Sequence, residues 1–293
     1  IAARQMDTGF GAMIGFELAV MRSYSVGSWS NFGAMVISIA LLGFGLAGTL
    51  LTFIQKSIRG APDRWLSGLA LALMPAMALA HVLAQRVPFN PVMITSDRGQ
   101  LLWIALYYAV YAVPFFVGAL FINASFLVLS SHVHSLYFWN MAGSGVGGLF
   151  ILLFMYLLPP DRLTIPLLGL ASVTAVLCLI EEQGPRLRLS AERLMMTAGT
   201  LLVSVALVLM FGRISVSEFK GISYARNFAD AKLHHHSYSP LGEMHVYGST
   251  AFHFAPGLSD NASLNLPTMP KNAFRGLYID GGGPIGIMRD LAP

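Results

Sequence analysis

Three consecutive histidines, His234, His235 and His236, are the residues of this chain whose type most directly indicates metal chemistry, and His245 and His253 follow within 20 residues. Neighbouring residues of a strand point alternately to opposite faces, so at most two of the three adjacent histidines can share one ion. We found no cysteine or carboxylate at ligand spacing from the run. We therefore interpret it as a solvated polar run and predict no metal site.

Glu17 and Arg22 are the second candidate for chemistry, because both lie inside the apolar stretch at 9–27. Charged side chains within a membrane span are costly and usually face the bundle interior or water. A spacing of five places them roughly 140° apart on a helix, so they are not a good intrahelical pair. We expect Arg22 to reach the interface and Glu17 to find a polar partner on another helix. Substrate or proton handling is the alternative.

The composition indicates which kind of protein must position these residues. Of the 293 residues, 55% are hydrophobic and 11% are charged, and the mean hydropathy is +0.65. Soluble domains carry about 25% charged residues, so the chain falls outside that class. The single cysteine, Cys178, excludes a disulfide framework and a thiolate metal cluster. The net charge of +4 is spread over short loops, which does not indicate a nucleic-acid partner.

Seven apolar stretches approach or exceed the roughly 20 residues that a helix needs to cross a bilayer. They cover residues 9–27, 31–55, 66–85, 101–129, 136–158, 164–181 and 194–212. The sequence therefore predicts a mainly α fold, with a multi-pass transmembrane bundle of about seven spans over 1–212. The basic residues after the second stretch and between the sixth and seventh favour the cytoplasmic side for those loops, whereas the basic residues of 213–232 favour the opposite orientation. Both orientations stay open.

Glycines cluster inside two of these stretches, and small residues let membrane helices approach closely. We predict helix-packing roles for Gly43, Gly45, Gly48, Gly143, Gly145 and Gly147. The 143–147 cluster superficially resembles a phosphate-binding loop, but it lies in an apolar stretch with no preceding strand.

The last segment, residues 213–293, has a different composition, with short alternating runs that predict strands. Asp280 and Gly281 form a strong tight-turn signal, so we predict a small β-rich extramembrane region with its turn there. Pro284, within the glycine-rich run that follows, favours a hairpin over a dinucleotide-binding loop. The chain stops at Pro293 soon after this turn and reads as unfinished. We assign no catalytic residue in this segment.

Five stretches taken together carry a family resemblance. They are GFGAMIGFELAVMR at 9–22, LLGFGLAG at 41–48, LYFWNMAGSGVGG at 136–148, YSPLGEMHV at 238–246 and LYIDGG at 277–282. In their order and spacing they resemble the membrane-embedded, spermidine synthase-like proteins of bacteria. The resemblance implies a helical membrane domain followed by an aminopropyltransferase-like domain, of which 213–293 is the first β-rich part. It also implies a bacterial inner membrane as the location.

The chain departs from the family pattern at three places. Asn140 stands where the family usually has Asp, Ser239 follows Tyr238 in place of Gln, and no Gln follows the turn at Asp280. The resemblance implies transfer of an aminopropyl group from decarboxylated S-adenosylmethionine to an amine. The nucleotide-binding half that performs this chemistry would lie beyond Pro293, so this chain has no cofactor of its own and binds that donor only if the missing half exists.

Two other functions stay open. The chain could be a non-enzymatic membrane subunit that packs against membrane-protein partners or against copies of itself within the bilayer. It could also be a transporter, with intramembrane polar residues such as Glu17, Arg22 and Asn140 lining a path, although no inverted repeat is evident.

Overall fold

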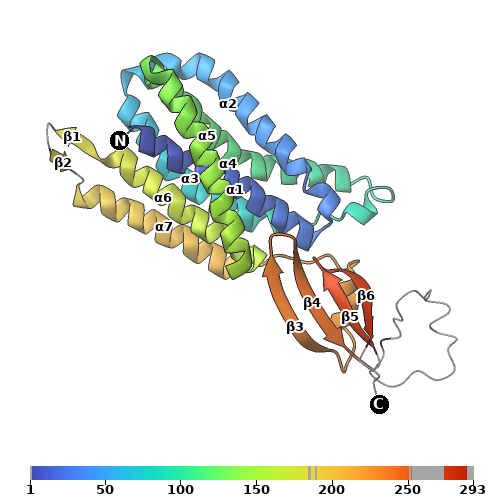
Figure 1. Cartoon of the computed structure of the whole chain (residues 1–293). Helices are drawn as coiled ribbons and strands as arrows, with labels where there is room; N and C mark the ends of the chain where they lie inside the picture. The colour runs from blue at the N-terminus through green and yellow to red at the C-terminus, as the bar shows by residue number, and fades with distance from the viewer. Residues whose placement is uncertain (1, 184–185, 189, 251, 253–273, 289–293) are drawn as a thin grey trace.

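The long apolar stretches form a bundle of helices, and the C-terminal segment forms a small sheet at one end of it (Figure 1). The computed structural model describes residues 2–183, 186–188, 190–250, 252 and 274–288. Within these ranges the long helices are α1 (Ala2–Gly27), α2 (Met35–Gly60), α3 (Pro62–Ala84), α4 (Gln100–Val128), α5 (Val133–Leu157), α6 (Thr164–Leu179) and α7 (Ala191–Phe211).

Among the described residues, six helices are long and apolar enough to cross a membrane, and they are α2 to α7. This confirms a multi-pass helical bundle followed by a small β region. The sequence predicted about seven spans, and α1 accounts for the difference. It forms the expected helix, but charged residues such as Glu17 and Arg22 make it more polar. Its apolar side chains are shielded by its neighbours instead, since α1 packs along α5 and α6 and buries Phe16 and Tyr24 almost completely.

Two of the predicted packing glycines lie where two helices pack closely together. A Cβ at Gly147 of α5 would collide with the backbone of Gly11 in α1, and a Cβ at Gly43 of α2 would come within 2.7 Å of Phe115 in α4. Gly143 is buried beside Gly11 as well. Small residues thus allow backbone-to-backbone packing at these positions.

The other three glycines have no close neighbour among the described residues. A Cβ at Gly45, Gly48 or Gly145 would meet nothing within 4 Å. These positions lie two or five residues along the helix from the packed ones, roughly 140–160° around its axis, so they face away from the neighbouring helix. They have no packing role among the described residues.

Short elements connect the long helices. The single-turn 3-10 helices are η1 (Ser30–Phe32), η2 (Pro91–Met93), η3 (Ser130–His132) and η4 (Pro160–Arg162), and a small hairpin of β1 (Glu181–Gln183) and β2 (Arg186–Arg188) joins α6 to α7. After α7 the chain forms α8 (Gly221–Arg226) and then enters the sheet.

Within the described part of the chain, the sheet has four antiparallel strands in sequence order: β3 (Lys232–Ser239), β4 (Gly242–Gly248), β5 (Phe274–Ile279) and β6 (Gly282–Met288). A two-residue turn joins β3 to β4, and Asp280 and Gly281 form the turn between β5 and β6. Both turn residues have positive φ, 51° at Asp280 and 73° at Gly281, which matches the right-handed twist of the flanking strands.

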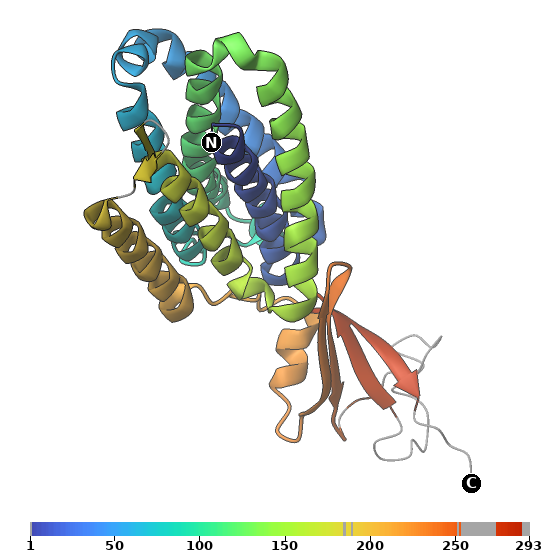
Figure 2. The same cartoon turned by 60° about the vertical axis from the view of Figure 1, so that its left-hand side comes forward.

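The two faces of the sheet differ in what covers them. α8 lies alongside one face of the sheet (Figure 2). On that face Ile222 and Ala225 pack with Tyr247 and Tyr278. The other face exposes apolar side chains of β4, β5 and β6, namely Met244, Ile279, Ile285 and Ile287. The polar residues described next lie on the face that α8 covers.

Candidate functional site

An ion pair joins the first helix of the bundle to the last turn of the sheet. Arg22 lies in α1, about one turn before the helix ends, and its Nη2 is 2.6 Å from Oδ1 of Asp280. The Arg22 Nη1 donates a hydrogen bond of 2.7 Å to the other carboxylate oxygen. The two side chains are 8% and 18% exposed, so this two-point contact is largely withdrawn from water.

Lys220, which immediately precedes α8, makes a second connection between the same parts. Its Nζ donates to the carbonyl oxygens of Ser25 and Val26 at the end of α1, at 2.6 and 2.9 Å, and to the carbonyl of Asp280 at 2.5 Å. Burial lowers the pKa of Lys220 to about 8, with Asp280 opposing that change and Arg22 adding to it. A cation at the carboxyl end of a helix also meets the negative end of the helix dipole.

Asp280 also forms hydrogen bonds with strand β4. Its Oδ1 accepts a hydrogen bond of 2.8 Å from the backbone N–H of Glu243, and its own N–H donates to the Glu243 carbonyl at 2.8 Å. The position of Glu243 is therefore coupled to the contact between Asp280 and Arg22.

The Glu243 carboxylate lies close to two histidines on the face that α8 covers. Its Oε1 is 2.7 Å from His236 Nε2 and 3.6 Å from His245 Nε2. The two imidazole rings stack with centroids 4.0 Å apart. Burial, together with the smaller effects of the nearby His236 and Arg226, lowers the pKa of His245 to about 4, so this ring is neutral at neutral pH.

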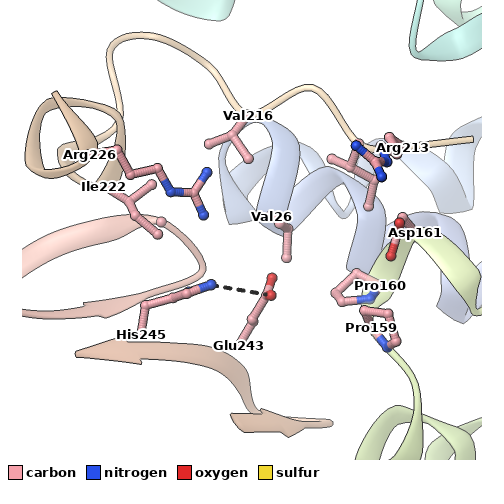
Figure 3. A pocket seen from close by; sticks show the side chains of 12 residues that line it. Val26, Pro159, Pro160, Asp161, Arg213, Val216, Ile222, Arg226, Glu243 and His245 are labelled. Carbon is pink, nitrogen blue, oxygen red and sulfur yellow. Dashed lines mark ion pairs between the residues drawn. The ribbon is translucent and has the colours of Figure 1, made fainter. Parts of the chain in front are cut away.

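A cavity of about 200 Å³ opens beside this cluster, between the sheet, α8 and the end of the bundle. Glu243 and His245 line it from the sheet, Asp161 lines it from η4, and Arg226 points into it from α8 (Figure 3). Arg213, in the segment after α7, lines the opposite side. Carboxylates, arginines and an imidazole thus converge on a space large enough for a small polar molecule.

A second cavity, of about 630 Å³, lies at the same end of the bundle. The end of α1, the segment between α3 and α4, and the segment 215–218 line it, with Tyr24, Gln85, Asn90 and Tyr107 among its polar side chains. Its lining is mainly neutral, so the smaller cavity has the stronger concentration of charged groups.

We call the region where the sheet contacts the end of the bundle the junction. Some of the predicted site residues lie at this junction, and the others lie elsewhere in the bundle. Arg22, Asp280 and Gly281 meet at the junction, and Gly281 lines the smaller cavity. Glu17 is half-buried in α1, and within the described residues no hydrogen bond or ion pair ties it to another helix. Asn140 is half-buried near the start of α5, at the end remote from the sheet.

The histidines do not all lie on one face of the sheet. His236 lies opposite His245 in the register of β3 and β4, whereas His235 points to the other face. His253 lies outside the described residues. The expectation that no carboxylate accompanies the histidines is corrected, because Glu243 lies within hydrogen-bond distance of His236.

Sequence reasoning missed Lys220, Arg226 and Glu243. Only Glu243 had a readable signal: it lies two residues before His245, which places both side chains on one face of a strand. Comparison of the chain with protein-family models, with curated proteins and with solved structures finds no match.

Proposed function

We propose that this chain is the membrane domain and the first sheet of a spermidine synthase-like protein of the bacterial inner membrane. In this proposal the bundle holds an aminopropyltransferase half against one membrane surface. One observation carries it: two of the stretches on which the resemblance depends, 9–22 and 277–282, are in direct contact through Arg22 and Asp280.

The geometry of the junction supports a positioning role for the bundle. A simple membrane anchor would need only a flexible linker. Here a short linker, residues 212–220, is fixed at both ends, because His81 in α3 lies 2.9 Å from the Gly212 carbonyl and Lys220 bridges α1 to Asp280. Contacts of this kind hold the sheet in one orientation relative to the membrane.

The proposed reaction is a displacement at carbon. The amine nitrogen of the acceptor attacks the aminopropyl carbon next to the sulfonium of decarboxylated S-adenosylmethionine, and its lone pair forms the new C–N bond. The C–S bond breaks, the sulfur keeps that electron pair as a neutral thioether, and the attacking amine loses a proton to a base. We assign none of these steps to a residue of this chain, and its residues serve to position the half that performs them.

The test uses the protein purified from its native membranes in detergent. Its intact mass and C-terminal peptides are measured first, and the same sample is then incubated with decarboxylated S-adenosylmethionine labelled in the aminopropyl group and with a set of diamines. We expect a mass well above 31.7 kDa, peptides of a glycine-rich nucleotide-binding segment, and labelled product.

Two outcomes contradict the proposal. A mass equal to that of this chain means that there is no catalytic half to position. A longer protein that transfers no label to any amine rejects the aminopropyltransferase activity. A stable partner that copurifies in either case favours the alternative, a non-enzymatic membrane subunit.

A further inference from the structure

Strands β3 and β4 bring three metal-binding side chains to one point on the sheet. The register pairs His236 directly with His245, and Glu243 lies two residues before His245 on the same face. One ligand atom from each of the three side chains lies within 4.8 Å of the other two. The side chains of Glu243 and His245 are only 10% and 7% exposed, while the His236 side chain is 29% exposed and forms the solvent-facing edge of the cluster.

The spacing is close to what one ion requires. Nitrogen and oxygen ligands lie about 2 Å from zinc, so neighbouring ligands in a tetrahedral site are about 3.3 Å apart. The Glu243 oxygen is 3.6 Å from His245 Nε2 and 2.7 Å from His236 Nε2. An ion could therefore enter by replacing the short hydrogen bond between Glu243 and His236. The side chain that must shift most is the His236 ring, because it is the most exposed of the three.

We propose that His236, Glu243 and His245 bind one divalent transition-metal ion, with zinc as the best match to two imidazoles and one carboxylate. This donor set leaves a fourth coordination position open. Glu243 and His245 line the 200 Å³ cavity, so that position faces it and takes water or an oxygen of a bound molecule. Arg226, which points into the same cavity, favours an anionic oxygen there (Figure 3).

The surrounding contacts hold the carboxylate in place. The backbone of Glu243 exchanges two hydrogen bonds with Asp280, which is itself paired with Arg22. Such outer contacts orient metal ligands and strengthen binding. The proposal does not depend on the aminopropyltransferase assignment, since it rests on the geometry of β3 and β4 alone.

The experiment titrates the purified, metal-stripped full chain in detergent with Co²⁺, followed by competition with Zn²⁺. Tetrahedral Co²⁺ has visible absorption bands that report its ligands. We expect one Co²⁺ per chain, displaced by Zn²⁺. We also expect Glu243→Gln and His236→Ala each to weaken binding by more than about tenfold, because each removes a direct ligand.

The matched control is His235→Ala, which removes the same residue type from the adjacent position of the same strand, on the opposite face. We expect it to bind Co²⁺ as the unchanged protein does. Circular dichroism and gel filtration show whether each variant is folded. His236→Ala removes a partly exposed side chain, so the buried core of the sheet is left intact.

Two results overturn the proposal. The first is no saturable binding by the unchanged, folded protein, in which case the three side chains are simply a hydrogen-bonded cluster. The second is an equal loss of binding in His235→Ala, which would show that the consecutive histidines chelate the ion at the surface.

Discussion

Arg22 and Asp280 are 258 positions apart in the sequence, yet both oxygens of the Asp280 carboxylate lie within 2.7 Å of the Arg22 guanidinium. One residue belongs to the first helix of the membrane bundle and the other to the last described turn of the sheet. Their contact is largely buried, and Lys220 and Glu243 are connected to it. The pair thus sets how the extramembrane sheet is placed on the bundle.

Replacing Arg22 with Met should destabilise this junction. Removal of one partner from a buried ion pair leaves the other charge uncompensated and costs about 3–5 kcal/mol. We expect the sheet to detach from the bundle before the bundle unfolds. The measurement is limited proteolysis, which should cleave the linker 212–220 much faster in the variant. Met keeps most of the apolar stem, so the result reports the lost charge.

Arg59→Met is the control for that experiment. Arg59 is exposed in the last turn of α2, at the end of the bundle remote from the sheet. Its replacement removes the same charge and should leave cleavage of the linker unchanged. Equal cleavage of the Arg22 variant and the unchanged protein would show that the ion pair does not hold the sheet.

A pair of glycines in α5 offers a second test. Gly147→Ala places a methyl group into the backbone of Gly11 in α1, and overpacking of this kind costs roughly 1–3 kcal/mol. Gly145→Ala adds the same methyl group where nothing lies within 4 Å. We expect a clear fall in the thermal midpoint in detergent for Gly147→Ala and little change for Gly145→Ala. Equal midpoints would show that the close approach of α1 and α5 contributes no stability.

Asp230 gives a prediction at acid pH. Its carboxylate accepts hydrogen bonds from the Thr250 backbone, the Thr250 hydroxyl and Ser249, and these lower its pKa to about 2. A carboxyl with a lowered folded pKa stabilises the fold above its ordinary value of 3.8 and loses that contribution as the pH falls toward 2. Asp230→Asn should therefore be less stable than the unchanged protein at neutral pH and should match it at the acid end. A difference in unfolding midpoint that stays constant over this range would contradict the assignment.

The sequence was sufficient for the parts of the fold that depend on local pattern. An apolar run of about 20 residues has few alternatives to a membrane helix, so α2 to α7 could be located closely. The turn at Asp280 and Gly281 could be read from turn chemistry alone, because few other residue pairs tolerate two positive φ angles.

The candidate site could not be predicted in the same way, because its contacts join distant segments. Nothing near Arg22 in the sequence indicates Asp280, and nothing near Lys220 indicates the carbonyl ends of α1. The register of β3 and β4 is the intermediate case. A two-residue turn after Ser239 pairs His236 with His245, and that pairing would have placed Glu243 beside them.

Lys220 provides the last prediction, at alkaline pH. Burial lowers its pKa from 10.5 to about 8, so above pH 8 the folded protein releases a proton that the unfolded chain still holds. Stability rises with pH wherever the unfolded state binds more protons, so this contribution increases from about pH 8 to about pH 10.5. The free energy of unfolding, measured relative to Lys220→Met, should rise by up to about 3 kcal/mol over that range. Lys232→Met, at the exposed start of β3, controls for the loss of one positive charge. A difference that falls with pH, or one that Lys232→Met reproduces, would mean that the ammonium of Lys220 is not disfavoured by burial at the junction.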